Sequence, residues 1–250
     1  MKLRTIAAIL ALAVPAFTFA QQNNFTILTN GTPTGKCYYT FDKAKDGYKV
    51  VSHYQSRISP HSITVSGESG DEGASKVVAE LQQIHSFKLD GSYQFLGSAI
   101  QDMIAQMNIG YSPNKQRTLL TISKVQGGAA ESMPQMPLQH DLIVLPDFDA
   151  SAIQALVLMA VNHPPTDGLF FLIVPPDSPR GGPLNGQARW SRGSDTAGTL
   201  DGKPVTVHHF SLPYGDNNYE IYADPDNTLL QVDVKTLHAS YVRNGFVLAK

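Results

Sequence analysis

The stretch closest to a catalytic pattern begins at Gly67-Glu68-Ser69. A nucleophile elbow, Gly-x-Ser-x-Gly, presents its serine at a sharp turn between a strand and a helix. The fifth position of this stretch is Asp71 rather than glycine, and residues 68–75 are small and polar. We therefore expect a surface loop at this place and no catalytic serine.

Histidines are the residues best suited to hold a metal ion. His208 and His209 are adjacent on an expected strand, so their side chains point to opposite faces and cannot share one ion. His53 and His61 lie on consecutive expected strands and could meet across a hairpin. No clustered carboxylate accompanies them, and the His-Glu-x-x-His pattern is missing, so we expect surface or core histidines. The chain has eight in total: His53, His61, His85, His140, His163, His208, His209 and His238.

Two further groups of side chains could bind ions. Asp224, Asp226 and Asn227 offer three oxygen ligands for calcium, but the twelve-residue loop that ends in glutamate is missing. These residue types also stabilise turns between strands through their own side chains, and we expect such a turn. Arginines suit an anionic ligand, although ion pairs at a rim are the simpler interpretation. The four arginines concerned are Arg180, Arg189, Arg192 and Arg243.

Other catalytic and cofactor patterns give little support to an enzyme. The glycine-rich patterns that hold dinucleotides and nucleoside triphosphates do not occur in the chain. The two carboxylates of a glycosidase pair only in space, so the sequence leaves them open. We therefore predict no catalytic, cofactor-binding or metal-binding residue, and an enzyme is the least favoured class.

Length and composition narrow the remaining classes. The 250 residues suffice for one large β domain or two small ones. The chain carries 19 Lys and Arg against 21 Asp and Glu, a formal net charge of −2. This balance disfavours a nucleic-acid-binding protein, which relies on a basic surface. The single cysteine, Cys37, excludes an intrachain disulfide and cysteine-rich zinc sites.

The first twenty residues, Met1–Ala20, have the pattern of a secretory signal peptide. Lys2 and Arg4 precede an apolar run over 6–14, and Thr18 and Ala20 supply the small residues before a cleavage site after Ala20. The run is shorter than the ~20 residues of a spanning helix, and no second long apolar run follows. The sequence predicts a mature protein of the periplasm or the extracellular space, with no transmembrane segment.

Turns and strands dominate the rest of the chain. Asn-Gly and Asp-Gly dipeptides, which favour tight hairpin turns, occur at residues 30–31, 46–47, 90–91, 167–168, 201–202 and 244–245. β-branched and aromatic stretches flank most of them and predict strands. The expected strands are 25–29, 35–41, 48–58, 62–66, 84–89, 92–95, 117–125, 138–145, 169–174, 205–212, 219–223, 229–234 and 240–243. Alternation in the second one places Cys37, Tyr39 and Phe41 on one face.

We expect these strands to form a mainly β fold in a single domain, 21–250. Its core is a large, curved antiparallel sheet or a half-open barrel. Polar stretches at 68–75, 126–137 and 177–186 are expected to be loops at the ends of strands. Such loops could surround a cavity.

One segment, 151–162, departs from the strand pattern. Its apolar residues recur at helical spacing, Ser151 and Gln154 match a capping box, and His163-Pro164-Pro165 ends it. Because the helix is apolar on all sides, it must be enclosed, and the concave side of the sheet would enclose it. Leu156 and Met159 would then contact either the core or a ligand.

Several short motifs resemble a known group of proteins. Gly35-x-x-x-Tyr39-x-Phe41 with Asp46-Gly47-Tyr48 opens the mature chain, and 200–205, 223–230 and 241–243 close it. This arrangement resembles uncharacterised secreted bacterial β-proteins related in shape to the periplasmic lipoprotein-carrier fold. The resemblance implies a half-open β-barrel with helices over an apolar cavity, and no catalytic residue. The present chain has one strong helix where the carriers have several.

Two classes of function follow from these expectations. The first is a non-catalytic secreted or periplasmic protein that binds a hydrophobic ligand or cargo, with Leu156 and Met159 as lining residues. The alternative is a structural or assembly protein of the cell envelope, in contact with another envelope protein. A ligand cavity would favour the first class, and a large exposed apolar patch or edge strand would favour the second.

Overall fold

The computed structural model describes residues 22–44, 47–56, 81–104, 106–132, 135–138, 141–144, 150–165, 167–173, 185–214 and 217–249. The predicted signal peptide, the strand at 62–66, the loop at 68–75, His61, His140 and Arg180 lie outside these ranges. Within them the chain is mainly β with one α-helix, as expected. None of the described helices is long and apolar enough to cross a membrane.

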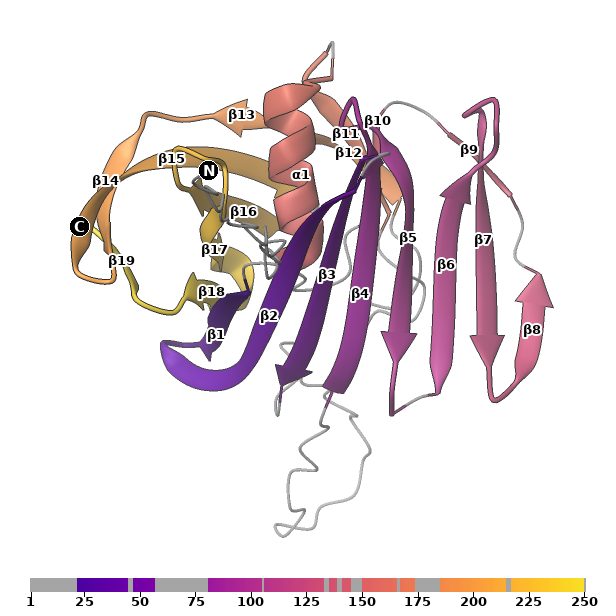
Figure 1. Cartoon of the computed structure of the whole chain (residues 1–250), viewed down its shortest axis with the longest axis horizontal. Helices are drawn as coiled ribbons and strands as arrows, with labels where there is room; N and C mark the ends of the chain where they lie inside the picture. Colours follow the sequence, from indigo (N-terminus) through magenta and orange to yellow (C-terminus); the bar gives the residue numbers. More distant parts are fainter. Residues whose placement is uncertain are drawn as a thin grey trace, which may run out of the picture.

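The N-terminal half of the chain forms a row of antiparallel strands (Figure 1). Each strand from β1 to β8 pairs with the next, and β9 pairs with β7. The strands are β1 (Asn23–Thr29), β2 (Thr32–Ala44), β3 (Gly47–Ser56), β4 (Leu81–Asp90), β5 (Phe95–Asp102), β6 (Met107–Pro113), β7 (Leu119–Gln126), β8 (Ala129–Ser132) and β9 (Met136–Pro137).

The C-terminal half extends the same sheet, because β18 pairs antiparallel with β1. The order continues β18-β17-β16-β15-β14-β19, and β13 pairs with β15. These strands are β13 (Ser191–Arg192), β14 (Thr196–Leu200), β15 (Lys203–Tyr214), β16 (Asn217–Ala223), β17 (Leu229–Val234), β18 (Ala239–Arg243) and β19 (Phe246–Leu248), with the short 3₁₀ helix η1 (Lys235–Leu237) before β18.

Strand β15 pairs with different strands in its first and its later residues. Its first residues, up to Val207, pair with β14, and its later residues, from His208, pair with β16. The chain turns at Asn244-Gly245 after β18, and β19 then pairs with β14. A small second core of Val207, Leu230 and Phe246 results.

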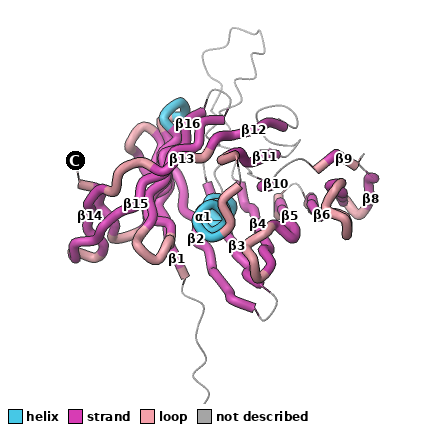
Figure 2. Tube along the Cα trace, turned by 90° about the horizontal axis from the view of Figure 1, so that it is seen from above, coloured by secondary structure: helices cyan, strands magenta, loops and turns pink. Residues whose placement is uncertain are grey.

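Helix α1 (Ala150–Asn162) lies against the concave side of the sheet. Every residue from Ala150 to Ala160 is buried, and the helix contacts β2, β3, β4, β10 and β17. Viewed along its axis, the helix is surrounded by strands (Figure 2). The predicted enclosure of an apolar helix is confirmed, and the helix ends at Asn162, before His163-Pro164-Pro165.

A small separate sheet accompanies the helix and was not predicted. It contains β10 (Asp141–Val144), β11 (Leu169–Ile173) and β12 (Asn185–Arg189). Strands β10 and β11 pair in parallel, with α1 between them in the chain, whereas β12 is antiparallel to β11. Phe170 and Leu172, on one face of β11, are fully buried, whereas Leu169 and Phe171 on the other face are half-buried.

Several hairpin turns form as predicted. Asn30 and Gly31 have φ values of 50° and 74° between β1 and β2, and Asp201 and Gly202 have 51° and 75° between β14 and β15. Positive φ at both positions is the geometry that tight hairpins require. Asp167-Gly168 differs, because it precedes β11 rather than joining two paired strands.

Two predicted boundaries were wrong. The expected strand 92–95 is a turn up to Gln94, because the Asp90 carboxylate accepts hydrogen bonds from the backbone N–H groups of Ser92 and Gln94. The strand begins at Phe95 instead. The expected loop 126–137 contains β8 and β9, two short strands whose sequences carry no apolar alternation.

Candidate functional site

The two residues predicted to line a ligand site are in the core. Leu156 and Met159 are both 0% exposed and pack in the main apolar cluster between helix and sheet. Their neighbour Leu158 is 8% exposed and borders a hollow beside the helix. The part of α1 that a ligand could reach is therefore the face of Leu158 rather than that of Leu156 and Met159.

This hollow, which we call the inner pocket, has a volume of about 270 Å³. It lies where α1 meets the start of β1, the middle of β2 and the turn between β16 and β17. Phe41 and Leu158 give it an apolar wall, and amide, hydroxyl and carboxylate groups form the rest. Its described lining residues are Asn23, Tyr39, Phe41, Gln154, Leu158, Asp226, Asn227 and Thr228.

The Gln154 side chain anchors the helix at this pocket. Its Oε1 atom accepts hydrogen bonds from the Tyr39 hydroxyl and from the backbone N–H of Leu229, the latter at 2.9 Å. Its Nε2 atom donates to the backbone oxygen of Asn227 at 2.8 Å. One amide therefore links α1 to β2 and to the β16–β17 turn, and it satisfies polar groups that burial would otherwise leave unbonded.

The predicted capping box does not describe this glutamine. Helix α1 begins at Ala150, so Ser151 lies inside its first turn. The Gln154 amide is engaged with Tyr39, Asn227 and Leu229. The prediction was wrong because long-range partners, which the sequence does not show, compete with the local capping bond.

The turn that completes the pocket is the predicted Asx turn. One oxygen of Asp224 accepts hydrogen bonds from the backbone N–H groups of Asp226, at 3.0 Å, and Thr228, at 2.8 Å. Burial raises the pKa of the Asp224 carboxyl, and the Arg243 guanidinium 3.9 Å away partly offsets this. The Asp224 carboxylate thus stabilises the turn, and the turn holds Asn227 against Gln154.

Tyr39 contributes a protonated hydroxyl to the pocket lining, and its one proton is donated to Gln154. Its side chain is fully buried, and burial raises the pKa of the phenol far above its usual value of 10.0. The hydroxyl therefore stays protonated, and it donates to Gln154. The ring stacks on Phe25 with centroids 5.6 Å apart, which fixes its position.

A row of half-buried aromatic rings continues from the pocket along the sheet. Phe41 stacks on Tyr48 at 5.5 Å between ring centroids, and Tyr48 stacks on Tyr93 at 4.4 Å. The hydrogen bond with Tyr48 is the main cause that raises the pKa of Tyr93 to about 12. The row offers a flat apolar surface next to the pocket.

Five of the six described histidines, all but His238, are engaged with different neighbours. His208 lies 3.9 Å from Asp195, and His209 bonds to Glu220 at 2.6 Å, so the two point to separate partners as predicted. His85 bonds to Gln83, His163 to Gln94, and His53 stacks on Tyr38. Over the described part of the chain, no three His, Cys, Asp or Glu side chains are grouped to hold a metal.

Of the three described arginines in the predicted group, two lie within ion-pair distance of a described carboxylate, as expected, and Arg189 does not. Arg189 donates to the backbone oxygen of Asp167. Arg192 pairs with Asp195 at 3.1 Å, and Arg243 lies near Asp224.

Sequence reasoning missed the polar half of the pocket. Tyr39 was assigned to the buried face of its strand, and the turn at Asp224–Asn227 was recognised, but nothing in the sequence joins them. The one available signal was Gln154, a polar residue on a helix that is otherwise apolar on all sides. A polar group at such a position needs a buried partner.

Comparisons of the chain with protein-family models, curated protein sequences and solved structures gave no match. The geometry of the inner pocket is therefore the basis for inferring a function.

Proposed function

We propose that this protein binds a small hydrophobic ligand that carries a polar group, and that the inner pocket is the binding site. The observation that supports this is the mixed lining of the pocket. Phe41 and Leu158 contribute apolar surface, and Gln154, Asn227 and Thr228 contribute polar groups. Ligand sites in proteins typically combine apolar walls with a few fixed polar groups.

The size of the pocket limits the ligand. A volume of about 270 Å³ lies just below the range of roughly 300–1,000 Å³ that is usual for ligand pockets. A compact molecule with up to three rings fits this space better than a complete lipid. The aromatic row of Phe41, Tyr48 and Tyr93 would support any part of the ligand that extends out of the pocket.

The pocket is also held in place before a ligand arrives. Gln154 bonds to both neighbouring elements, and the Asx turn at Asp224 fixes Asn227 and Thr228. A site whose groups are already ordered loses less conformational entropy on binding. This favours a rigid binding site over a lid that opens.

The location of the protein is part of the proposal. The signal-peptide pattern of Met1–Ala20 supports export to the periplasm or the extracellular space. There the chain would act as a non-catalytic binding protein. N-terminal sequencing of exported protein should begin at Gln21, and a retained Met1 would contradict export.

Titration with the neutral fluorescent amine 1-N-phenylnaphthylamine tests the binding site. This probe has an apolar body and one N–H group, so it can contact both the apolar and the polar lining residues of the pocket. We expect saturable binding to the parent protein. In Leu158→Trp the larger ring would fill the pocket, and we expect at least a tenfold loss of affinity, about 1.4 kcal/mol.

Val161→Trp is the matched control on the same helix. Val161 is 38% exposed and is not among the lining residues of the inner pocket. It should bind the probe like the parent protein. Equal binding by all three proteins, or no binding by the parent, would reject the inner pocket as the site. The alternative of a structural or assembly role at the cell envelope would then be preferred.

A further inference from the structure

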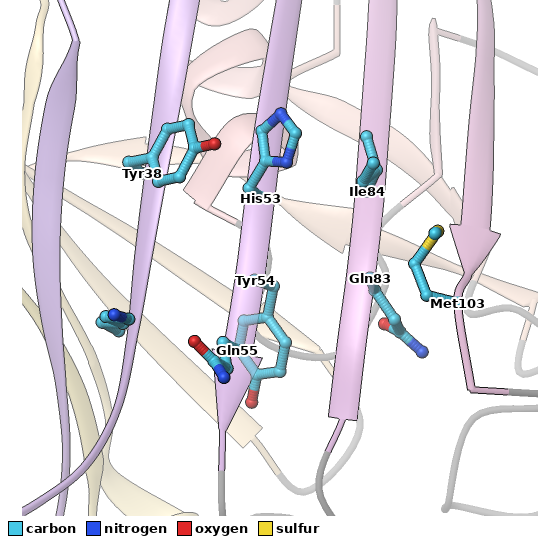
Figure 3. Close-up of a pocket in the computed structure, with 8 residues that line it drawn as sticks. Tyr38, His53, Tyr54, Gln55, Gln83, Ile84 and Met103 are labelled. Carbon is cyan, nitrogen blue, oxygen red and sulfur yellow. The ribbon is translucent and has the colours of Figure 1, made fainter.

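The opposite face of the sheet carries a second hollow, which we call the outer pocket (Figure 3). Its volume is about 240 Å³. Tyr38, His53 and Ile84 lie side by side on β2, β3 and β4, and Gln55, Gln83 and Met103 lie nearer the strand ends (Figure 3). Lys36 and Tyr54 complete the described lining.

The polar groups of the outer pocket carry positive charge or none. Lys36 is exposed and makes no ion pair with another described residue. No aspartate or glutamate is among the described lining residues, and His53 is the other basic group. Gln83 is committed elsewhere, because it bonds to Asp102 at 2.8 Å and to His85 at 2.9 Å. An ammonium group without a carboxylate partner attracts an anion.

The remaining wall combines two stacked rings with apolar side chains. The rings of Tyr38 and His53 stack with centroids 4.6 Å apart and planes inclined by 15°. Ile84 continues the row on β4, and Met103 beside it is 50% exposed. Ile104, the next residue, is 56% exposed. An exposed methionine beside this row adapts readily to apolar ligands.

We propose that the outer pocket binds an organic anion with a flat apolar body, such as an aromatic carboxylate or sulfonate. The anionic group would pair with Lys36, and the body would lie against Ile84 and Met103 beside the stacked rings of Tyr38 and His53. This site is separate from the inner pocket, because Tyr38 and Tyr39 project from opposite faces of β2. It does not depend on the function proposed above.

The probe for this site is 1-anilinonaphthalene-8-sulfonate, which adds a sulfonate to the neutral probe used for the inner pocket. We expect its addition to shift the NMR signals of the His53 ring, which the His53→Gln variant identifies by their loss. In Lys36→Gln the affinity should fall about fivefold, the effect of one partly exposed ion pair.

Lys88→Gln is the matched control. Lys88 is exposed on β4, four residues beyond the lining residue Ile84, and is not itself a lining residue. The variant therefore removes the same charge without touching the pocket. Its affinity should stay within about twofold of the parent protein. Equal weakening in both lysine variants, or His53 signals that do not move, would overturn the proposal. Leu158→Trp should keep the His53 shift, which separates this result from any failure at the inner pocket.

Discussion

The two faces of β2 show how one strand serves two environments. Tyr39 faces the helix, is fully buried, and donates a hydrogen bond to Gln154. Tyr38, the preceding residue, is half-buried on the other face and stacks on His53. The chemistry of the two side chains is the same, and only the face of the sheet differs. The covering of each face of the sheet therefore decides the role of a residue on β2.

The inner face also depends on packing that the outer face lacks. Helix α1 covers β2, β3 and β4 on the inner side, and eleven consecutive helix residues are buried there. The outer side presents Tyr38, His53 and Ile84 around a shallow hollow. Substitutions on the inner face should therefore affect stability most, and those on the outer face should change it little.

The largest effect is expected for Leu156→Ala. Leu156 is 0% exposed in the core beneath α1, and truncation there leaves a cavity. The free energy of unfolding should fall by about 2–5 kcal/mol, measured by urea denaturation. Val161→Ala on the same helix, with a side chain 38% exposed, should change it by less than about 1 kcal/mol. A small effect at Leu156 would mean that the helix is a lid rather than core.

A smaller effect should distinguish the two tyrosines of β2. Tyr39→Phe removes the hydroxyl that donates to Gln154, while the Gln154 oxygen keeps its bond from the Leu229 N–H. The loss of one buried hydrogen bond should cost about 0.5–1.5 kcal/mol in the free energy of unfolding. Tyr38→Phe should cost less than about 0.5 kcal/mol. Equal costs would contradict the difference between the faces.

The smallest effect concerns the C-terminal half, where Glu220 makes a charged network. It bonds to His209 at 2.6 Å, to Asn218 at 2.8 Å and to Lys235 at 3.1 Å. Burial acts to raise the pKa of Glu220, but the bonds from His209 and Lys235 outweigh it and lower that pKa below 4.5.

A lowered pKa in the folded state stabilises the fold above the unfolded value and loses this contribution as the pH falls through the folded value. Glu220→Gln should therefore reduce stability at pH 7 and flatten the loss of stability below about pH 4.5. Thermal unfolding of both proteins between pH 7 and pH 3 checks this. A parallel pH dependence in both would contradict the role of Glu220.

Local patterns in the sequence predicted much of the fold. Asn30-Gly31 and Asp201-Gly202 identified hairpins, because their backbone geometry depends on those residues alone. Alternation placed Cys37 and Tyr39 on the buried face, and both are buried. The apolar sides of 151–162 required enclosure, and α1 is enclosed. These features follow from interactions between neighbours in the chain.

Other features depended on contacts between distant segments. The parallel pairing of β10 with β11, the return of β19 to β14 and the strand nature of β8 have no local signature. The edge strand β8 lacks alternation because its side chains are exposed.

The candidate sites were decided by tertiary structure in the same way. The sequence predicted a helix near a ligand site, with Leu156 and Met159 as lining residues. Because that helix is apolar on all sides, its sequence does not show which residues face the site. Only packing against the sheet shows that these two are in the core and that Leu158 borders the pocket. The bond between Tyr39 and Gln154 spans 115 residues of the chain. Residue types and periodicity act over a few positions, so the sequence determined strands, turns and the helix, whereas the folded chain alone determined which side chains meet.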